Sequence, residues 1–432
     1  MKYGGELLCA FIGCAFGCGE KALVDSDGGN AASSSSGGNS SGGPAIEDGS
    51  SSGSSSGTAG GVLGSATCGA AALGVAGEGG DGACGHDCLG GACSGGACQP
   101  VVLVTVPSPG IGSFAIDATS VYWTSLWTGD DGGALPTNGV VAKCAIAGST
   151  ARPTLLAAGQ AFPEDILVSG STLYWLDYNA ASLMQCSVDC NGAPTTFQNW
   201  WPNIWQGGFA ASATEVFFSG PQEDGLVEQC PVSGCSAPTT FASRQQTPTA
   251  MVIGGADLYW LDEGTMLTNP NGADVSDVNG GLMTCPVDGC DGGPAAIVTG
   301  LSNPDGLVVS GTTAYFAQGN SVLACSVTGC NGTPTTILSL PAGSGGVQGF
   351  AVDATDVYVA DAVQAGVVFS YDWEIRRCSL SGCPNGSTLL SSTPYVSGGS
   401  FGGSGPVPGL VVDGTRIYFV SGDATQVLAL AK

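Results

Sequence analysis

The chain has 432 residues, of which 35 are acidic and only 9 are basic, so its formal net charge at pH 7 is −26. This balance excludes the clustered Lys and Arg with which proteins bind nucleic acids and anionic membrane surfaces. A lysine-poor acidic surface keeps an exported protein soluble, and cation binding is the functional alternative.

The first 18 residues have the pattern of an export signal. Lys2 gives a charged start, and an apolar run over residues 7–16 follows it. Cys18 follows Ala-Phe-Gly and resembles the lipid-modified cysteine of a bacterial lipoprotein, with Cys14 as the competing site. We therefore expect an exported protein that is either secreted or anchored at the outer membrane or cell surface by a lipid on Cys18.

A linker and a cysteine-rich segment follow the signal. Residues 19–67 are mostly Gly, Ser, Ala and Asn, which predicts a disordered linker because such a segment cannot bury a core. Residues 68–100 contain five cysteines and His86, the one histidine of the chain. In an exported protein this pattern predicts a small stalk held by disulfides, and a zinc site is the alternative.

Residues 101–432 contain seven copies of one strand–turn–strand unit. Each copy has an apolar strand, a tight polar turn and a second strand with an aromatic position, which recurs at intervals of 42 to 60 residues. That position is occupied by Trp123, Trp175, Phe218, Trp260, Phe316, Val359 and Phe419. Alternation with period two within a long four-stranded repeat predicts an all-β, seven-bladed β-propeller. We expect the three repeat tryptophans to lie in its core.

The seventh unit lacks a fourth strand after residues 427–431. Residues 101–106, VVLVTV, form a spare strand before the first unit. Because an open ring would expose edge strands, we expect residues 101–106 to form the outer strand of the blade built from residues 409–431.

Close cysteine pairs straddle the turn between the third and fourth strands of five units. We expect hairpin disulfides at Cys186/Cys190, Cys230/Cys235, Cys285/Cys290, Cys325/Cys330 and Cys378/Cys383. Cys144 has no second cysteine in its unit, so we expect it to bond a stalk cysteine, namely Cys98, which is nearest to the closing strand. If Cys18 is lipidated, the sixteen cysteines from Cys68 onward can all pair.

The stalk sequence GHDCLGGACSGGACQP, followed by units of the type DATSVYW, resembles a group of predicted secreted lipoproteins of myxobacteria. The units are also distantly similar to the YWTD propeller repeats of lipoprotein-receptor ectodomains. Leu176-Asp177 stands where that pattern has Thr-Asp. The resemblance covers roughly residues 84–432 and implies architecture alone, because the group has no common chemistry.

Long segments interrupt the repeats at 125–139, 198–208, 262–280, 341–348, 360–373 and 396–408. Each joins strands two and three of a blade or joins neighbouring blades. Propeller topology brings both kinds of connection to the same face, here called the inserted-loop face. Loops enlarged on one face of a rigid scaffold commonly bind ligands.

Tryptophans and carboxylates gather in or beside these segments. The candidate ligand-binding residues are Trp127, Trp200, Trp201, Trp205, Asp262, Glu263, Asp361 and Trp373. Further carboxylates nearby are Asp130, Asp131, Asp177, Asp274, Asp277, Asp372 and Glu374. Aromatic plates beside acids predict binding of a glycan or a peptide, and the alternative is that each tryptophan packs its own loop. We expect no cofactor, with calcium as the one candidate cation for the acids.

The expected propeller region contains no histidine, which excludes a Ser-His-Asp triad and histidine-ligated metals there. Asp117, Asp353 and Asp413 precede tight turns and predict Asx turns rather than calcium ligands. We therefore interpret the protein as a monomeric, non-catalytic binding propeller. The alternatives are a glycoside-active enzyme with paired carboxylates and a purely structural envelope protein.

Overall fold

A computed structural model describes residues 65–69, 84, 87–94, 96–107, 110–125, 138–148, 152–199, 208–219, 225–268, 274–341, 344–364, 371–383, 386–395 and 409–432. The chain divides into two units, Met1–Gly57 and Thr58–Lys432. The expected export signal, Cys18 and nearly all of the expected linker lie outside the described residues. No helix in the described ranges is long and apolar enough to cross a membrane.

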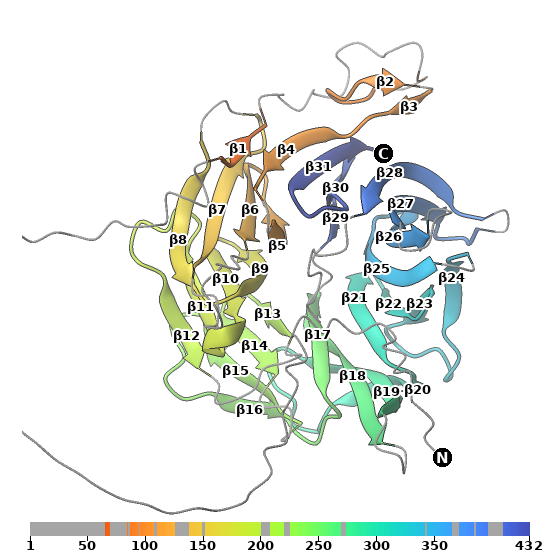
Figure 1. Ribbon diagram of the computed structural model, residues 1–432. Helices are drawn as coiled ribbons and strands as arrows, with labels where there is room; N and C mark the ends of the chain where they lie inside the picture. The colour runs from red at the N-terminus through yellow and green to blue at the C-terminus, as the bar shows by residue number, and fades with distance from the viewer. Residues whose placement is uncertain are drawn as a thin grey trace, which may run out of the picture. The chain divides into compact units, whose positions relative to one another are not determined.

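The second unit contains seven antiparallel sheets arranged as the blades of a propeller (Figure 1). Blade 1 contains β5 (Ile111–Ile116), β6 (Ser120–Ser125), β7 (Gly139–Ala145) and β8 (Thr154–Gln160). Blade 2 contains β9 (Pro163–Ser169), β10 (Thr172–Asp177), β11 (Ser182–Ser187) and β12 (Thr195–Asn199), with a short 3-10 helix η1 (Tyr178–Ala180) after β10. Blade 3 contains β13 (Phe209–Ala211), β14 (Glu215–Ser219), β15 (Val227–Pro231) and β16 (Thr239–Ala242).

The remaining blades follow the same order. Blade 4 contains β17 (Pro248–Gly254), β18 (Asp257–Thr268), β19 (Asp274–Pro286) and β20 (Ala295–Leu301). Blade 5 contains β21 (Pro304–Ser310), β22 (Thr313–Gln318), β23 (Ser321–Ser326) and β24 (Thr335–Ser339). Blade 6 contains β25 (Ser344–Val352), β26 (Asp356–Gln364), β27 (Tyr371–Ser379) and β28 (Thr388–Tyr395). Blade 7 contains β29 (Leu410–Val412), β30 (Arg416–Val420), β31 (Gln426–Ala431) and, from the start of the propeller, β4 (Val101–Thr105).

Strand β4 closes the ring as expected. It pairs antiparallel with β31, so that Val104 lies opposite Val427. A further strand that the sequence did not predict, β1 (Thr67–Cys68), pairs with the outer side of β4. The last blade therefore has five strands, and its edge is covered rather than open.

The repeat aromatics form the core between blades. Trp123, Trp175 and Trp260 are fully buried, as predicted. Buried apolar side chains form seven clusters, and each cluster joins two neighbouring blades. Successive residues of a strand point to opposite faces of its sheet, so Trp175 packs toward blade 1 while Tyr174 packs toward blade 3. One aromatic pair thus binds a blade to both of its neighbours.

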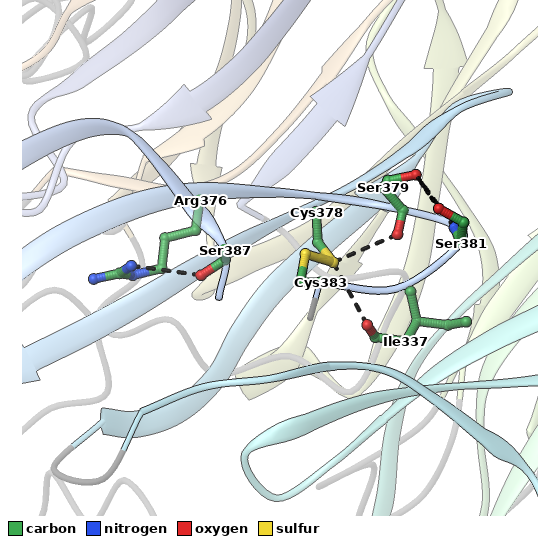
Figure 2. Close-up of a disulfide and its surroundings, with 7 residues drawn as sticks. All are labelled: Ile337, Arg376, Cys378, Ser379, Ser381, Cys383 and Ser387. Atoms are coloured by element: carbon green, nitrogen blue, oxygen red, sulfur yellow. Dashed lines mark hydrogen bonds between the residues drawn. A yellow bond between two sulfur atoms is a disulfide. The ribbon is translucent and has the colours of Figure 1, made fainter. Parts of the chain in front are cut away.

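The five predicted hairpin disulfides are present. They join Cys186 to Cys190, Cys230 to Cys235, Cys285 to Cys290, Cys325 to Cys330 and Cys378 to Cys383. Each packs against an apolar residue on the outer strand of the preceding blade. Figure 2 shows the fifth, where the Cys378 sulfur lies 3.5 Å from the carbonyl oxygen of Ile337. These disulfides therefore fill apolar space between blades and also crosslink their own hairpins.

The second cysteine of each pair lies in the connection that follows the third strand. Each pair straddles the first tight turn of that connection, and Cys190 and Cys235 precede β12 and β16. The N–H of Cys190 closes a tight turn on the carbonyl oxygen of Ser187, and Cys190 itself has a φ of 45°. Cys190 and Cys235 are half-buried, whereas Cys230 is buried. A separation of four or five residues spans only the first tight turn, so these bonds do not reach the fourth strand.

The stalk cysteines occupy the two junctions that have no hairpin disulfide. Cys84–Cys93 and Cys88–Cys98 lie in the junction between blades 6 and 7, beside the short strands β2 (Cys93–Ser94) and β3 (Ala97–Cys98). Cys68–Cys144 lies in the junction between blades 7 and 1.

Cys144 bonds a stalk cysteine as expected, but its partner is Cys68 and not Cys98. Pairing of β1 with β4 places Cys68, not Cys98, beside blade 1.

Two of the inserted segments continue the sheet. In blade 4 the second and third strands extend as a hairpin to Thr268 and Asp274, and in blade 6 they extend to Gln364 and Tyr371. We expected loops at 262–280 and 360–373, but antiparallel strand pairing continues through much of both segments.

The three aspartates before tight turns make Asx turns, as predicted. One carboxylate oxygen of Asp117 accepts hydrogen bonds from the N–H groups of Thr119 and Ser120, and the other accepts one from the Tyr122 hydroxyl. Asp353 and Asp413 repeat this pattern. Burial alone would raise the pKa of these carboxyls, but the hydrogen bonds lower it below its usual value.

Candidate functional site

The first strand of each blade lies nearest to the axis of the ring. The first strands of several neighbouring blades contact one another, as β5 contacts β9 and β17 contacts β21. Each first strand is entered from an inter-blade connection, so it begins at the inserted-loop face. Side chains at these starting points surround the axis of the propeller.

Three first strands begin with the same backbone device. In each of them a residue of positive φ precedes a proline, and a second residue of positive φ stands two positions after that proline. The segments are 162–165, 247–250 and 303–306. The second such residue is Asp165 (φ 44°), Ala250 (φ 36°) or Gly306 (φ 54°). The pairing register shifts there in all three strands, which marks a β-bulge. Bulges re-aim side chains and are frequent beside functional sites.

Two of these bulges carry acids. Blade 2 supplies Glu164 and Asp165, and blade 5 supplies Asp305; we call these three residues the axial acids. Glu164 and Asp165 are buried, with 3% and 6% of their surfaces exposed. Asp305 is solvent-exposed, yet protein groups surround it closely enough to raise the pKa of its carboxyl. Asp305 therefore stands at the surface, at the start of its inner strand, with protein groups close around it.

The axial acids influence one another electrostatically. Burial, opposed by a hydrogen bond from Tyr178 and assisted by the charge of Asp305, raises the pKa of Asp165 to about 7. Burial, together with the adjacent Asp165, raises the pKa of Glu164 well above its usual range. Since Asp165 and Asp305 come from blades 2 and 5, the ring brings together acids that are 140 positions apart in the sequence.

Tyr178 completes this group. Its hydroxyl lies 3.4 Å from Asp165 Oδ2 and donates a hydrogen bond to it, while its ring packs edge-on against Phe162. Burial and the charges of Asp165 and Glu164 raise the pKa of the phenol. The sequence did not identify Glu164, Asp165, Asp305 or Tyr178 as site residues. The repeated proline before a bulge is the signal that could have found the acids.

The predicted residues Asp262 and Asp361 lie at the same end of the blades but belong to a structural pattern. One oxygen of Asp262 accepts the N–H of Gln246, and one oxygen of Asp361 accepts the hydroxyl of Ser344. Asp177 accepts the N–H of Ala161 in the same way. These carboxylates hold the connection that leads into the first strand of their own blade.

The repeat tryptophans support the same connection. Trp175 Nε1 donates to Gln160 and Trp260 Nε1 donates to Gln245, at 3.0 and 3.1 Å. The second oxygens of Asp177, Asp262 and Asp361 are buried and have no hydrogen-bond partner among the described residues. Burial raises the pKa of Asp177 and of Asp262 to about 6.

The other predicted site residues are placed as follows. Trp127, Trp200, Trp201 and Trp205 lie outside the described residues. Glu263 is buried beside Asp262. Trp373 is only 1% exposed, because it lies on β27 and packs in the junction between blades 6 and 7. It is therefore not an aromatic plate open to a ligand, contrary to expectation, since the extended hairpin carries it into the core.

Within the described ranges, the only group of three residues spaced to hold a metal ion is Cys84, Cys88 and Cys98. All three sulfurs form disulfides, which leaves no thiolate for zinc. A groove of about 410 Å³ lies at the outer strand of blade 3 and the Cys290 turn of blade 4, lined by residues that include Phe241 and Arg244. It is separate from the axial acids, and its lining offers few convergent polar groups.

No protein-family model matches the chain, and no curated protein matches it. Among solved structures, a catalytically inactive variant of virginiamycin B lyase from Staphylococcus aureus with quinupristin aligns with a TM-score of 0.50 at 12% identity, over 77% of this chain and 98% of that chain. A chain of the nidogen/laminin complex aligns with a TM-score of 0.40 at 15% identity, over 57% and 88%. The tricorn protease aligns with a TM-score of 0.32 at 11% identity, over 72% and 28%.

At these identities the similarity shows the fold alone, and only the lyase alignment is close enough to support even that. The chain is a seven-bladed β-propeller with distant structural relatives. The resemblance to myxobacterial lipoproteins stays a prediction.

Proposed function

We propose that the protein is an exported, non-catalytic binding protein that holds a peptide or a glycan on its inserted-loop face. Two observations support this most: Glu164, Asp165 and Asp305 stand at the bulges that begin two inner strands, and Asp165 and Asp305 interact electrostatically. Carboxylates there can accept hydrogen bonds from hydroxyl, amide or amine groups. The eight disulfides among the described residues indicate an oxidising compartment.

The attachment of the protein is a further part of the proposal. A lipid on Cys18 would tether a monomeric propeller to the outer membrane or cell surface through the Gly/Ser-rich linker. Mass spectrometry of the N-terminal peptide from exported protein checks this. The expected result is a diacylglycerol-modified Cys18 and loss of membrane attachment in Cys18→Ser. An unmodified, freely secreted chain would contradict the anchor without touching the binding function.

The binding function is tested with the full chain on glycan and peptide arrays. Asp165→Asn/Asp305→Asn should lose at least tenfold in affinity for whatever the parent binds, because it removes two acceptor charges at the axis. Asp288→Asn/Asp291→Asn is the matched control, since it removes the same charge from exposed turn residues on the opposite face. Equal loss in both variants, or no ligand on either array, would contradict the proposal.

A glycoside-active enzyme is the second candidate, and the paired acids favour it. Asp165 with a pKa of about 7 could stay protonated beside a second carboxyl, as a general acid requires. In the inactive lyase variant, alanine replaces one histidine. The single histidine of this chain, His86, precedes every propeller strand from β4 onward, so this candidate relies on carboxyl groups instead. Release of reducing sugar from a polysaccharide panel, abolished by Asp165→Asn, would establish this candidate in place of the first.

A further inference from the structure

No ion pair among the described residues includes an axial acid. The ion pairs among the described residues join Lys143 to Asp189, Arg376 to Glu374 and Lys432 to Asp353. None of these pairs includes Glu164, Asp165 or Asp305. Within the described ranges, the Tyr178 hydroxyl donates a hydrogen bond to Asp165 and the N–H of Gly306 donates one to Asp305.

Glu164 gives an independent reason to expect a ligand. Its side chain is only 3% exposed, and its Oε1 atom has no hydrogen-bond partner in the described part of the chain. Leaving a buried polar atom unpaired costs free energy, because the atom has lost its water without gaining a partner. Glu164 also acts electrostatically on Tyr178, the residue that donates to Asp165, so its carboxyl belongs to the same group. A donor from outside the chain would satisfy it.

The spacing of the acids distinguishes between classes of cation. No three carboxylates of the described residues bring one oxygen each within 4.8 Å of one another. Calcium needs its oxygens at about 2.3 to 2.6 Å, so three carboxylates around one ion would have to lie closer than this. A guanidinium group reaches farther, because it directs five N–H groups from three nitrogen atoms and each extends a hydrogen bond of about 2.8 Å. An ammonium group can donate to two of the acids and attract the third through its charge.

We propose that Glu164, Asp165 and Asp305 bind the basic side chain of a peptide, an ammonium or a guanidinium group, at the axis of the propeller. This inference rests on the proposed binding function and names its ligand class. A neutral sugar would leave the three acids without a countercharge.

Binding of a cation should release protons. The groups that face Asp165 are Glu164 from its own strand, Tyr178 from η1 and Asp305 from β21, and the propeller strands contain no histidine. Their carboxyls have raised pKa values in the free protein, so part of the group is protonated near pH 7. A positive charge beside them favours the ionised form and expels those protons.

The test uses the full oxidised chain and isothermal titration calorimetry. The probes are four acetylated, amidated pentapeptides with Lys, Arg, Gln or Met at the centre of a Gly/Ser sequence, and calcium chloride. We expect the Lys or Arg peptide to bind at least tenfold more tightly than the Gln peptide and to release protons at pH 7, measured in two buffers of different ionisation enthalpy. Asp165→Asn/Asp305→Asn should abolish this preference, and Asp288→Asn/Asp291→Asn should keep it.

Thermal unfolding of both double variants separates lost binding from lost folding; if the axial variant does not fold, Glu164→Gln is measured in its place. Equal affinity for the Lys and Gln peptides, or calcium binding that the axial variant loses, overturns the inference. If a glycan binds the parent and the axial variant equally, the ligand class is wrong while the binding function stands.

Discussion

The disulfide Cys68–Cys144 joins blade 7 to blade 1, where the chain closes the ring. Its sequence separation is 76, against 5 for the hairpin disulfide Cys325–Cys330. A crosslink lowers the entropy of the unfolded chain in proportion to the logarithm of the loop that it closes. At 25 °C this gives about 4.5 kcal/mol for the first bond and about 2 kcal/mol for the second.

The two bonds can be compared by replacing both cysteines of each pair with alanine. With an unfolding entropy of about 2.1 cal/mol/K per residue over roughly 330 propeller residues, Cys68→Ala/Cys144→Ala should lower Tm by about 6 °C. Cys325→Ala/Cys330→Ala should lower Tm by about 3 °C and is the matched control, since Cys325 and Cys144 are both buried. Both are measured by calorimetry and by urea unfolding.

Hydrogen exchange locates the effect. Without Cys68–Cys144, amides of β4 and β31 should exchange faster than amides of β22 and β23, because the ring is then closed by hydrogen bonds alone. If Cys68→Ala/Cys144→Ala loses no more stability than Cys325→Ala/Cys330→Ala, the loop-closure reasoning is refuted.

Three further predictions concern the closing strand, the buried acids and the loop tryptophans. Leu103→Ala in β4 should cost about 2 to 5 kcal/mol in urea unfolding, whereas Leu155→Ala, at a position 40% exposed, should change little; equal effects would contradict closure by β4. Burial raises the pKa of Asp262 to about 6 in the folded protein, so the folded state favours the protonated form and this group's contribution to stability is lost as pH rises from about 4 to about 6. Asp262→Asn keeps an acceptor for Gln246 and should therefore be about 2 to 3 kcal/mol more stable than the parent at pH 7 but not at pH 4; an unchanged pH profile would refute the assignment. Replacing Trp200, Trp201 and Trp205 with alanine should abolish ligand binding and leave the circular dichroism and Tm of the parent, and a variant that unfolds would show that these residues are structural.

Much of the fold could be predicted from the sequence because its causes are local. Period-two alternation and the repeated aromatic position predicted the blades, and the short cysteine spacings predicted the hairpin disulfides. The missing fourth strand predicted closure by residues 101–106, because each blade needs the same set of pairings. The Asx turns followed from an aspartate two residues before a turn threonine.

The structural role of Asp262 also had a sequence signal that we did not use. Asp177 holds residue 161, Asp262 holds residue 246, Gln318 holds residue 302 and Asp361 interacts with residue 345, always 16 positions earlier. A constant separation in four of the seven blades indicates a contact that belongs to the repeat. By that reasoning these polar residues belong first to the scaffold.

The sequence by itself determined the number of blades, the closing strand and the cysteine pairs that lie within one hairpin, because each depends on residues close in the chain or repeated along it. The tertiary structure decided that Cys144 bonds Cys68, since that choice depends on an extra strand pairing outside β4. It also decided that Asp165 and Asp305 act on one another. Ring closure places blades 2 and 5 around one axis. The proline before each bulge is a local signal, but no local pattern encodes which blades then interact across that axis.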